Sequence, residues 1–279
     1  MTSGSLYRLA AFTTNPAGGT PAGVWMGDEL PQPSKMQRIA AEVGFSETAF
    51  IVPSRGTHRT VRYYSPEAEV SFCGHATIAA GVVLGESTGD GTYYLSTIVG
   101  EVPVSVRSQD GLREASLTSV QPSSAAVPHH LLYEALSHLY WAQSELDPQI
   151  PPALAYAGAY HLVLAAATLT RLNTLEYDYE GLKKLMLKEN LTTVQLVWRE
   201  SEYIFHARNP FPVGGVVEDP ATGAAAAALG GYLRAAGLIT PPAALLIRQG
   251  EAMGRPSRLQ VDIPITGGIV VSGAAVRLD

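Results

Sequence analysis

Two stretches of the sequence share a plan in which a strand-like run leads through a short turn into a helix built largely of alanine and glycine. The first turn covers residues 71–77 (SFCGHAT) and the second residues 218–224 (EDPATGA). A helix without a polar face is typically buried on every side. We therefore expect two central helices, over residues 74–84 and 222–236, each surrounded by its own strands.

The similarity extends to the segments before these turns. Residues 48–66 hold two strand-like runs that end in Ser-Pro, and residues 194–210 hold two that end in Asn-Pro. The two prolines, at 66 and 210, are 144 positions apart, and other counterparts are up to 147 apart. A spacing this long indicates a diverged internal duplication rather than a solenoid repeat. Two unrelated strand-helix units are the alternative.

The duplication predicts an α+β fold of two pseudo-symmetric lobes, each a β-barrel-like sheet around a central helix. We place the N-terminal lobe at residues 1–118 and the C-terminal lobe at 119–267. The alternating segment 268–279 is expected to return to the first lobe as a strand. Ligand sites often lie between such halves, so we expect a cleft between the lobes.

Composition excludes several classes of protein. The 279 residues carry a net charge of −6, and no cluster of Lys and Arg offers a surface for nucleic acid. The apolar runs are too short to span a membrane, and the first residues lack the pattern of a signal peptide. We therefore expect a cytoplasmic protein with neither nucleic acid nor membrane as partner. The single cysteine cannot form an internal disulfide.

Three residues are candidates for acid–base chemistry. Glu47 begins an apolar strand, where burial is expected to raise the pKa of its carboxyl toward neutrality. His75 lies at the first turn, where the positive end of a helix favours a neutral imidazole. Asp219 lies at the second turn and is assigned the place that corresponds to His75. Each of the three has a structural alternative, as a helix cap or a surface group.

Cys73 is a weaker candidate. A helix N-terminus favours a thiolate there, but a buried structural cysteine is the simpler interpretation. The second turn has no cysteine, so a two-thiol racemase is not supported. The remaining histidines show no metal-ligand spacing, and no glycine-rich nucleotide motif occurs, so neither a metal site nor a cofactor is predicted.

Four stretches together resemble the PhzF-like family of phenazine biosynthesis, which shares its fold with diaminopimelate epimerase. They are residues 44–50 (GFSETAF), 72–77 (FCGHAT), 218–223 (EDPATG) and 249–257 (QGEAMGRPS). They follow one another in the family's order over almost the whole chain. The resemblance implies two lobes, each a sheet around a central helix, with the active site between them.

The resemblance also implies a cofactor-independent isomerase. Glu47 would move a proton within a small carboxylated substrate, and His75 and Asp219 would position that substrate. The expected substrate-binding residues are Cys73, Gly74, Thr222, Gly223, Ala224 and Thr20. Members of the family are commonly homodimers, so a homodimer is expected as well.

Two departures from the family pattern concern the substrate. Thr20 stands where the family usually has Asn, and Ala224 stands where it usually has Ser. Each change removes a polar contact to a ligand. A catalytically inactive ligand-binding or interaction protein on the same scaffold is therefore the alternative function, and an epimerase that uses Cys73 is a third possibility.

Overall fold

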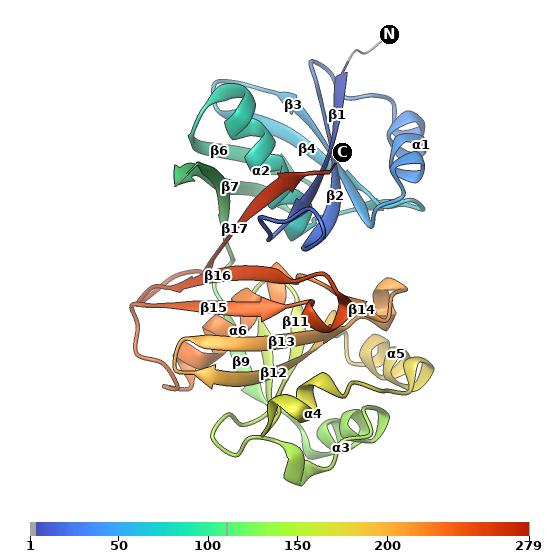
Figure 1. Cartoon of the computed structure of the whole chain (residues 1–279). Helices are drawn as coiled ribbons and strands as arrows, with labels where there is room; N and C mark the ends of the chain where they lie inside the picture. Colours follow the sequence, from blue (N-terminus) through green and yellow to red (C-terminus); the bar gives the residue numbers. More distant parts are fainter. Residues whose placement is uncertain (1–3, 110, 279) are drawn as a thin grey trace. The chain divides into compact units, whose positions relative to one another are not determined.

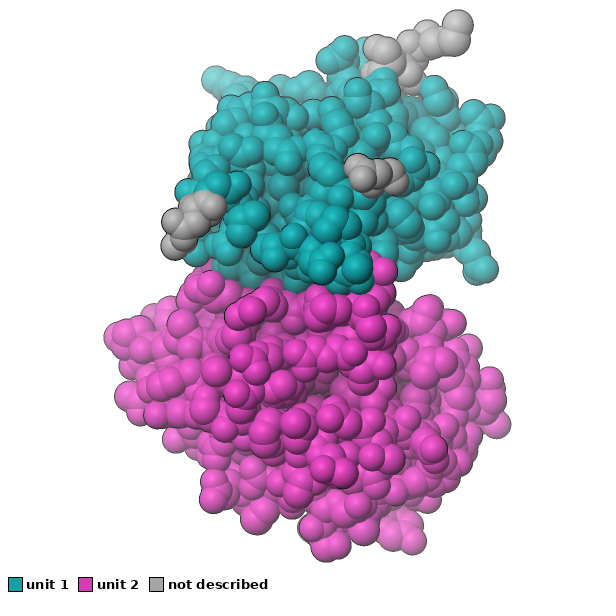
Figure 2. Space-filling model, viewed as in Figure 1, with its two compact units in different colours: residues 1–118, 272–279 teal, residues 119–271 magenta. Residues whose placement is uncertain are grey.

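The computed structural model describes residues 4–109 and 111–278. The chain divides into two compact units, which are coloured separately in Figure 2. Unit 1 comprises Met1–Thr118 and Ser272–Asp279, and unit 2 comprises Ser119–Val271. Within the described ranges, no helix combines the length and the apolar character that crossing a bilayer requires.

Unit 1 is a closed barrel of eight strands. Around the barrel, each strand pairs with the next in the order β1, β2, β3, β4, β6, β7, β8 and β17, and β17 pairs again with β1. The short β5 adds to β4. The strands are β1 Gly4–Ala11, β2 Thr20–Gly27, β3 Glu47–Pro53, β4 His58–Tyr64, β5 Glu69–Val70, β6 Gly91–Thr97, β7 Gly100–Gln109, β8 Leu112–Thr118 and β17 Val270–Arg277.

Helix α2, Gly74–Thr88, is the central helix of this barrel and packs against β1, β2, β3, β7 and β8. Ten successive residues of α2, from Ala76 to Gly85, are buried. A Cβ atom added at Gly81 would lie 2.7 Å from the Cβ of Ala115 on β8, so only glycine permits this approach of strand and helix. Helix α1, Pro33–Val43, packs against β3 and β4 (Figure 1).

Unit 2 repeats this plan with seven strands paired in the order β9, β10, β11, β12, β13, β15 and β16. Its central helix α6 packs against β9, β10, β11 and β16. The strands are β9 Ser123–Ala126, β10 Ala153–Tyr156, β11 Tyr160–Ala165, β12 Thr193–Ser201, β13 Ile204–Pro210, β14 Glu218–Asp219, β15 Ala243–Gln249 and β16 Ser257–Ile263. The helices are α3 His129–His138, η1 Gln143–Glu145, α4 Leu169–Asn173, α5 Tyr179–Lys188, η2 Pro212–Gly214, α6 Gly223–Ala235 and η3 Glu251–Met253.

The two units are structural repeats of each other. In unit 1 the pairs β1–β2, β3–β4, β4–β5 and β6–β7 are antiparallel, whereas β2–β3 and β4–β6 are parallel. In unit 2 the counterparts β10–β11, β12–β13, β13–β14 and β15–β16 are antiparallel, and β11–β12 and β13–β15 are parallel. Parallel and antiparallel strand pairs follow one another in the same order around both central helices. This confirms the predicted two-lobed fold.

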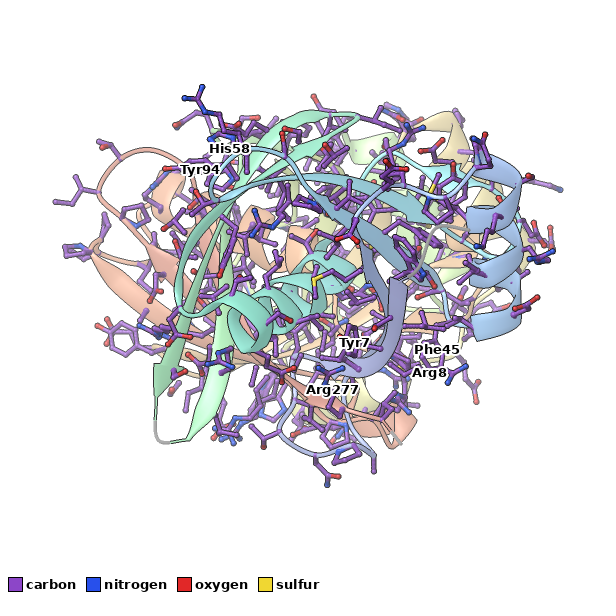
Figure 3. All side chains as sticks on the ribbon, turned by 90° about the horizontal axis from the view of Figure 1, so that it is seen from above. Tyr7, Arg8, Phe45, His58, Tyr94 and Arg277 are labelled. Carbon is purple, nitrogen blue, oxygen red and sulfur yellow. The ribbon has the colours of Figure 1, made fainter. Side chains whose placement is uncertain are left out.

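The C-terminal strand is fixed to the first strand of the chain. Leu9 pairs with Arg277 in the antiparallel ladder between β1 and β17. The guanidinium carbon of Arg277 lies 4.1 Å from the ring centroid of Tyr7, and Figure 3 shows the two side chains together. Such a cation–π contact contributes about 0.5–2 kcal/mol. The last strand therefore closes a barrel that the first 118 residues begin.

Candidate functional site

Glu47 is placed by the turn between helix α1 and strand β3. Helix α1 ends at Gly44, whose φ of 71° is the left-handed conformation that glycine adopts without strain. Three residues later Glu47 begins β3, and it stands opposite Ala22 in the parallel pair with β2. The carboxylate therefore lies at the end of the barrel where β3 begins. Thr20 precedes Ala22 by two residues, so its side chain is on the same face of β2.

Cys73 and His75 are placed by the beginning of helix α2. Cys73 is the N-cap residue, and its carbonyl accepts a 2.6 Å hydrogen bond from the hydroxyl of Thr77. The Thr77 hydroxyl also lies 2.7 Å from the hydroxyl of the buried Tyr63 on β4. These two bonds anchor the first turn of α2 to the barrel wall. The first N–H groups of the helix have no partner within the helix itself.

The three side chains meet at one point. The Nε2 atom of His75 lies 3.1 Å from Oε2 of Glu47, and the Sγ atom of Cys73 lies 3.5 Å from the same oxygen. Sγ is also 3.5 Å from both ring nitrogens of His75, and the hydroxyl of Ser46 is 3.3 Å from Nε2. The side chains of Glu47 and His75 are 21% and 12% exposed, so solvent reaches both only partly.

The charge state of this pair differs from the sequence-based expectation. Burial alone would raise the pKa of the Glu47 carboxyl, but the hydrogen bond and charge of His75, with hydrogen bonds from Ser46 and Cys73, bring it below its ordinary value. Burial alone would lower the pKa of His75, but the neighbouring Cys73 and Glu47 raise it well above its ordinary value. The expectations of a raised Glu47 pKa and a neutral His75 were both wrong. These two directions favour a carboxylate on Glu47 and an imidazolium on His75.

Cys73 behaves as a buried thiol. Burial raises the pKa of Cys73, and the charge of Glu47 raises it further, whereas His75 and a backbone hydrogen bond lower it. The net result is a pKa above the ordinary value of a cysteine. A thiol whose pKa is raised keeps its proton at neutral pH. Cys73 is thus not activated as a nucleophile in this state.

The second turn, in unit 2, forms its own hydrogen-bonded group. The Oδ2 atom of Asp219 accepts a 2.8 Å bond from the Thr222 hydroxyl. The buried Gln249, at the end of β15, accepts from the Thr222 N–H at 3.2 Å and donates to the Asp219 carbonyl at 2.7 Å. Gly223 and Ala224 then form the first turn of α6. Gln249 was named only within a matching stretch, because it lies far from the turn in sequence.

The correspondence between the two turns also needs correction. Cys73 and Thr222 are the N-cap residues of the two central helices, so Ala224 rather than Asp219 occupies the place that corresponds to His75. Asp219 pairs with Asn209 between β14 and β13, and Val70 pairs with Tyr63 between β5 and β4, so Asp219 occupies the place that corresponds to Val70. The position that matches Cys73 is thus a threonine, and the chain has no second thiol there.

The predicted site residues form two groups. Glu47, Cys73, Gly74 and His75 come together in unit 1, where Thr20 is buried and its hydroxyl has no partner among the described residues. A second set, in unit 2, comprises Asp219, Thr222, Gly223 and Ala224. That both groups contribute to one active site stays a prediction. The atoms of Glu47, Cys73 and His75 are also close enough to ligate one metal ion.

Comparison with known proteins decides the family. Residues 9–278 match the model of the PhzC-PhzF family, described as phenazine biosynthesis-like proteins. The chain belongs to this family. An uncharacterised isomerase of Deinococcus radiodurans is 32% identical over 268 residues, which cover 93% of this chain and 87% of that protein. The trans-2,3-dihydro-3-hydroxyanthranilate isomerase of Pseudomonas fluorescens is 30% identical over 89% of this chain and 86% of its own length.

Solved structures of the PhzF family have the same fold. The phenazine biosynthesis protein of Bacillus anthracis superimposes with a TM-score of 0.86 at 22% identity, covering 98% of this chain and 96% of that one. A hydroxyproline epimerase of Agrobacterium vitis has a TM-score of 0.68 at 14% identity, covering 100% and 92%. These structures share the fold of the chain, and the family match with its relatives named as isomerases makes the chain an isomerase.

Proposed function

We propose that this PhzF-like isomerase moves a proton between two carbon atoms of a small carboxylated substrate without a cofactor, and that Glu47 carries the proton. The observation that supports this most directly is the contact between Glu47 and His75, with Nε2 3.1 Å from Oε2. The low pKa of Glu47 means that the group is a carboxylate at neutral pH. A general base must be in this form before it can accept a proton.

The proposed step conserves atoms and electrons within the substrate. The Glu47 carboxylate removes a proton from one carbon, and the electron pair of that C–H bond moves into the adjacent unsaturated system as an enolate. The carboxylic acid then returns the proton to a second carbon, which restores the carboxylate. No electron leaves the substrate, so the step needs no oxidant or reductant. General acid–base catalysis of this kind contributes about 10²- to 10⁴-fold in rate.

The beginning of helix α2 supplies a place for negative charge. The N–H groups of Gly74 and His75 lie in the first turn of the helix, where N–H groups have no partner within the helix and the helix dipole is positive. Such groups bind carboxylates and stabilise developing enolates. His75 holds Glu47 in orientation, so we assign His75 a positioning role as well as a place near the substrate.

The test is hydrogen exchange in D₂O with a panel of small unsaturated and cyclic carboxylic acids, followed by NMR. The panel includes trans-2,3-dihydro-3-hydroxyanthranilate, the substrate named for the Pseudomonas fluorescens relative. We expect at least one acid to incorporate deuterium with the wild type and to lose this in Glu47→Gln. Glu42→Gln is the matched control, because Glu42 is an exposed residue of α1 that pairs with Arg38.

Two results would contradict the proposal. Exchange that survives in Glu47→Gln but is lost in Cys73→Ala would assign the chemistry to the thiol. Tight binding of an acid with no exchange would indicate a ligand-binding protein, for which the alanine at position 224, with no polar side chain to offer a ligand, would be a reason. The Cys73→Ala variant therefore accompanies every measurement on Glu47→Gln.

A further inference from the structure

One face of the sheet in unit 2 carries polar side chains in the interior of the protein. Leu196 of β12 belongs to the apolar cluster beneath helices α3 and α5, so the residues that alternate with it point to the other face, on the side of the central helix α6. Four polar residues lie on this interior face, each at most 1% exposed. They are His161, Thr193, Gln195 and Asn209.

These side chains satisfy one another only in part. The Nδ1 atom of His161 lies 2.8 Å from the Thr193 hydroxyl, which donates to Oδ1 of Asn209 at 3.0 Å. Nε2 of His161, Nδ2 of Asn209 and both polar atoms of the Gln195 amide have no hydrogen-bond partner among the described residues. In native proteins, buried polar atoms nearly always have a partner, either in the protein or in ordered water.

Another glutamine of the same unit shows what protein partners alone can provide. Gln249 is as deeply buried as Gln195, and its Nε2 donates to the Asp219 carbonyl at 2.7 Å and to the Thr222 hydroxyl at 2.9 Å. Its Oε1 accepts from the Thr222 N–H at 3.2 Å. The described part of the chain offers neither kind of contact to Gln195.

The repeat in unit 1 satisfies the corresponding place from its central helix. Strands β4 and β13 begin 146 positions apart, so Tyr63 corresponds to Asn209. The Tyr63 hydroxyl lies 2.7 Å from the hydroxyl of Thr77 on α2. Helices α2 and α6 begin 149 positions apart, so the counterpart of Thr77 is Ala226, whose side chain has no polar atom. Helix α6 therefore cannot supply this partner in unit 2.

Gln195 and Asn209 are neighbours across the pair of strands β12 and β13. The antiparallel register sets Leu196 opposite Arg208, which brings Gln195 opposite Asn209 at the next position. Residues opposite each other have Cβ atoms about 4.5–5.5 Å apart, so one molecule of the size of water can contact both amide groups. His161 lies on the same face, opposite Thr193 in the parallel pair of β11 and β12.

We infer that this interior face of unit 2 binds internal water, which completes the hydrogen bonds of Gln195, Asn209 and His161. A buried water molecule typically makes about three hydrogen bonds, so about one or two molecules suffice. Asn209 also stands opposite Asp219 in the ladder between β13 and β14, so the water supports the strand that carries Asp219. The inference does not depend on the function proposed above.

The mixture of donors and acceptors specifies water as the ligand. The NH₂ groups of Gln195 and Asn209 donate, whereas Oε1 of Gln195 accepts. Burial lowers the pKa of His161 to about 3, so its ring is neutral at pH 7, and Nε2 accepts because Nδ1 donates to Thr193. The NH₂ groups repel a cation and the carbonyl oxygen repels an anion. A water molecule both donates and accepts, so it fits all of these atoms.

The first test observes the wild-type protein directly. Oxygen-17 magnetic relaxation dispersion counts water molecules that stay bound inside a protein, and a high-resolution crystal structure locates them. We expect ordered water about 2.7–3.2 Å from the amide nitrogens of Gln195 and Asn209. A crystal structure that resolves ordered water elsewhere but has none at these nitrogens would overturn the inference.

The second test is the variant Gln195→Met, which keeps the length of the side chain and removes its polar atoms. If water bonds to Gln195, the variant should lose at least one long-lived water molecule, and the midpoint of urea unfolding should fall because the remaining polar atoms lose their partner. Gln143→Met is the control, because Gln143 is exposed, and it should change neither quantity.

The opposite result of this variant is equally definite. If the Gln195 amide has no partner, Gln195→Met removes an unsatisfied polar group, so the midpoint should rise while the number of long-lived water molecules stays the same. That outcome would overturn the inference. If Gln195→Met does not fold, the wild-type crystal structure decides alone. Neither test uses a substrate, so failure of the proposed function would leave the water site standing.

Discussion

Glu47 and His75 form a largely buried ion pair between the first residue of β3 and the first turn of α2, with Nε2 3.1 Å from Oε2. The pair joins two elements that the sequence separates by a strand, a loop and a second strand. It helps to set the charge of the proposed base: burial raises the pKa of Glu47, and the hydrogen bond and charge of His75, together with hydrogen bonds from Ser46 and Cys73, bring it below its ordinary value.

Replacement of His75 should therefore change how the rate depends on pH. In His75→Gln, burial remains and raises the pKa of Glu47 without the imidazolium to oppose it. Activity that requires the carboxylate then needs a higher pH, so the acid limb of the rate profile should move upward and the rate at pH 7 should fall. Exchange measured between pH 4 and 8 tests this. The control is His58→Gln, because His58 is a half-buried histidine of β4 that pairs with Glu101. An unmoved acid limb in His75→Gln would contradict the assignment.

His161 should make the fold sensitive to acid. It is completely buried in unit 2, and burial lowers its pKa to about 3 from an ordinary 6.5. The Thr193 hydroxyl donates to Asn209, so Nδ1 of His161 is the donor to Thr193 and Nε2 lacks a proton. Between pH 6.5 and 5, His161 becomes protonated in the unfolded chain but stays neutral in the folded chain. The free energy of unfolding should therefore fall by up to about 1.4 kcal/mol per pH unit as the pH is lowered. In His161→Gln this decrease should be smaller.

His75 should act on the other side of pH 6.5, because its pKa is raised in the folded protein. Its contribution is fully present below about pH 6.5 and is lost as the pH rises through its folded value. Urea unfolding from pH 5 to 8 should thus give lower stability on both sides of pH 6.5. His161→Gln should flatten only the acid side, and His75→Gln only the alkaline side. Equal effects of both variants over the whole range would be inconsistent with these two pKa directions.

The glycines of helix α2 should differ sharply in their tolerance of alanine. A Cβ atom at Gly81 would meet Ala115 at 2.7 Å and Val104 at 2.9 Å, whereas one at Gly74 has nothing within 4 Å. Overpacking costs about 1–3 kcal/mol, and glycine to alanine in an unhindered helix gains up to about 1 kcal/mol. Chemical denaturation should show Gly81→Ala destabilised and Gly74→Ala unchanged or stabilised. A stabilised Gly81→Ala would mean that the strand can move away from the helix.

The sequence predicted the two central helices because their composition alone requires burial on every side. It predicted the wrong register between the repeats because the loop from β13 to β14, residues 211–217, is three residues longer than its counterpart 65–68. Equivalent residues of the two units are 146 positions apart at the start of β3 and β12. After the insertion they are 149 positions apart, at the start of α2 and α6. The charges of Glu47 and His75 could not be predicted, since each depends on a partner 28 positions away and not on local sequence.

Asp219 provides a test of whether unit 2 contributes to the chemistry. Asparagine at this position can still accept the 2.8 Å hydrogen bond from the Thr222 hydroxyl, so Asp219→Asn removes charge while it keeps the turn. If Asp219 takes part in substrate positioning, the exchange rate should fall by more than about 10-fold at unchanged stability. Asp262→Asn on β16 is the control. A loss of stability with an unchanged rate would assign Asp219 a structural role.

Removing one partner of the buried ion pair between Arg208 and Glu218 should cost more stability than removing one partner of an exposed ion pair. Nε and Nη2 of Arg208 donate to the two carboxylate oxygens of Glu218 at 2.9 and 2.6 Å, and the Glu218 side chain is only 4% exposed. Arg208→Met leaves that carboxylate buried without a partner, which typically costs about 3–5 kcal/mol. Replacing both residues with apolar ones should recover most of this stability, because no isolated charge remains.

The control is the exposed ion pair between Arg107 and Glu114, where removal of Arg107 should cost about 1 kcal/mol or less. Urea unfolding of the single and double variants measures the coupling, and a double variant as unstable as Arg208→Met would show that the guanidinium acts through packing. Because Glu218 directly precedes Asp219, the same variants should also lower activity if unit 2 contributes to the site.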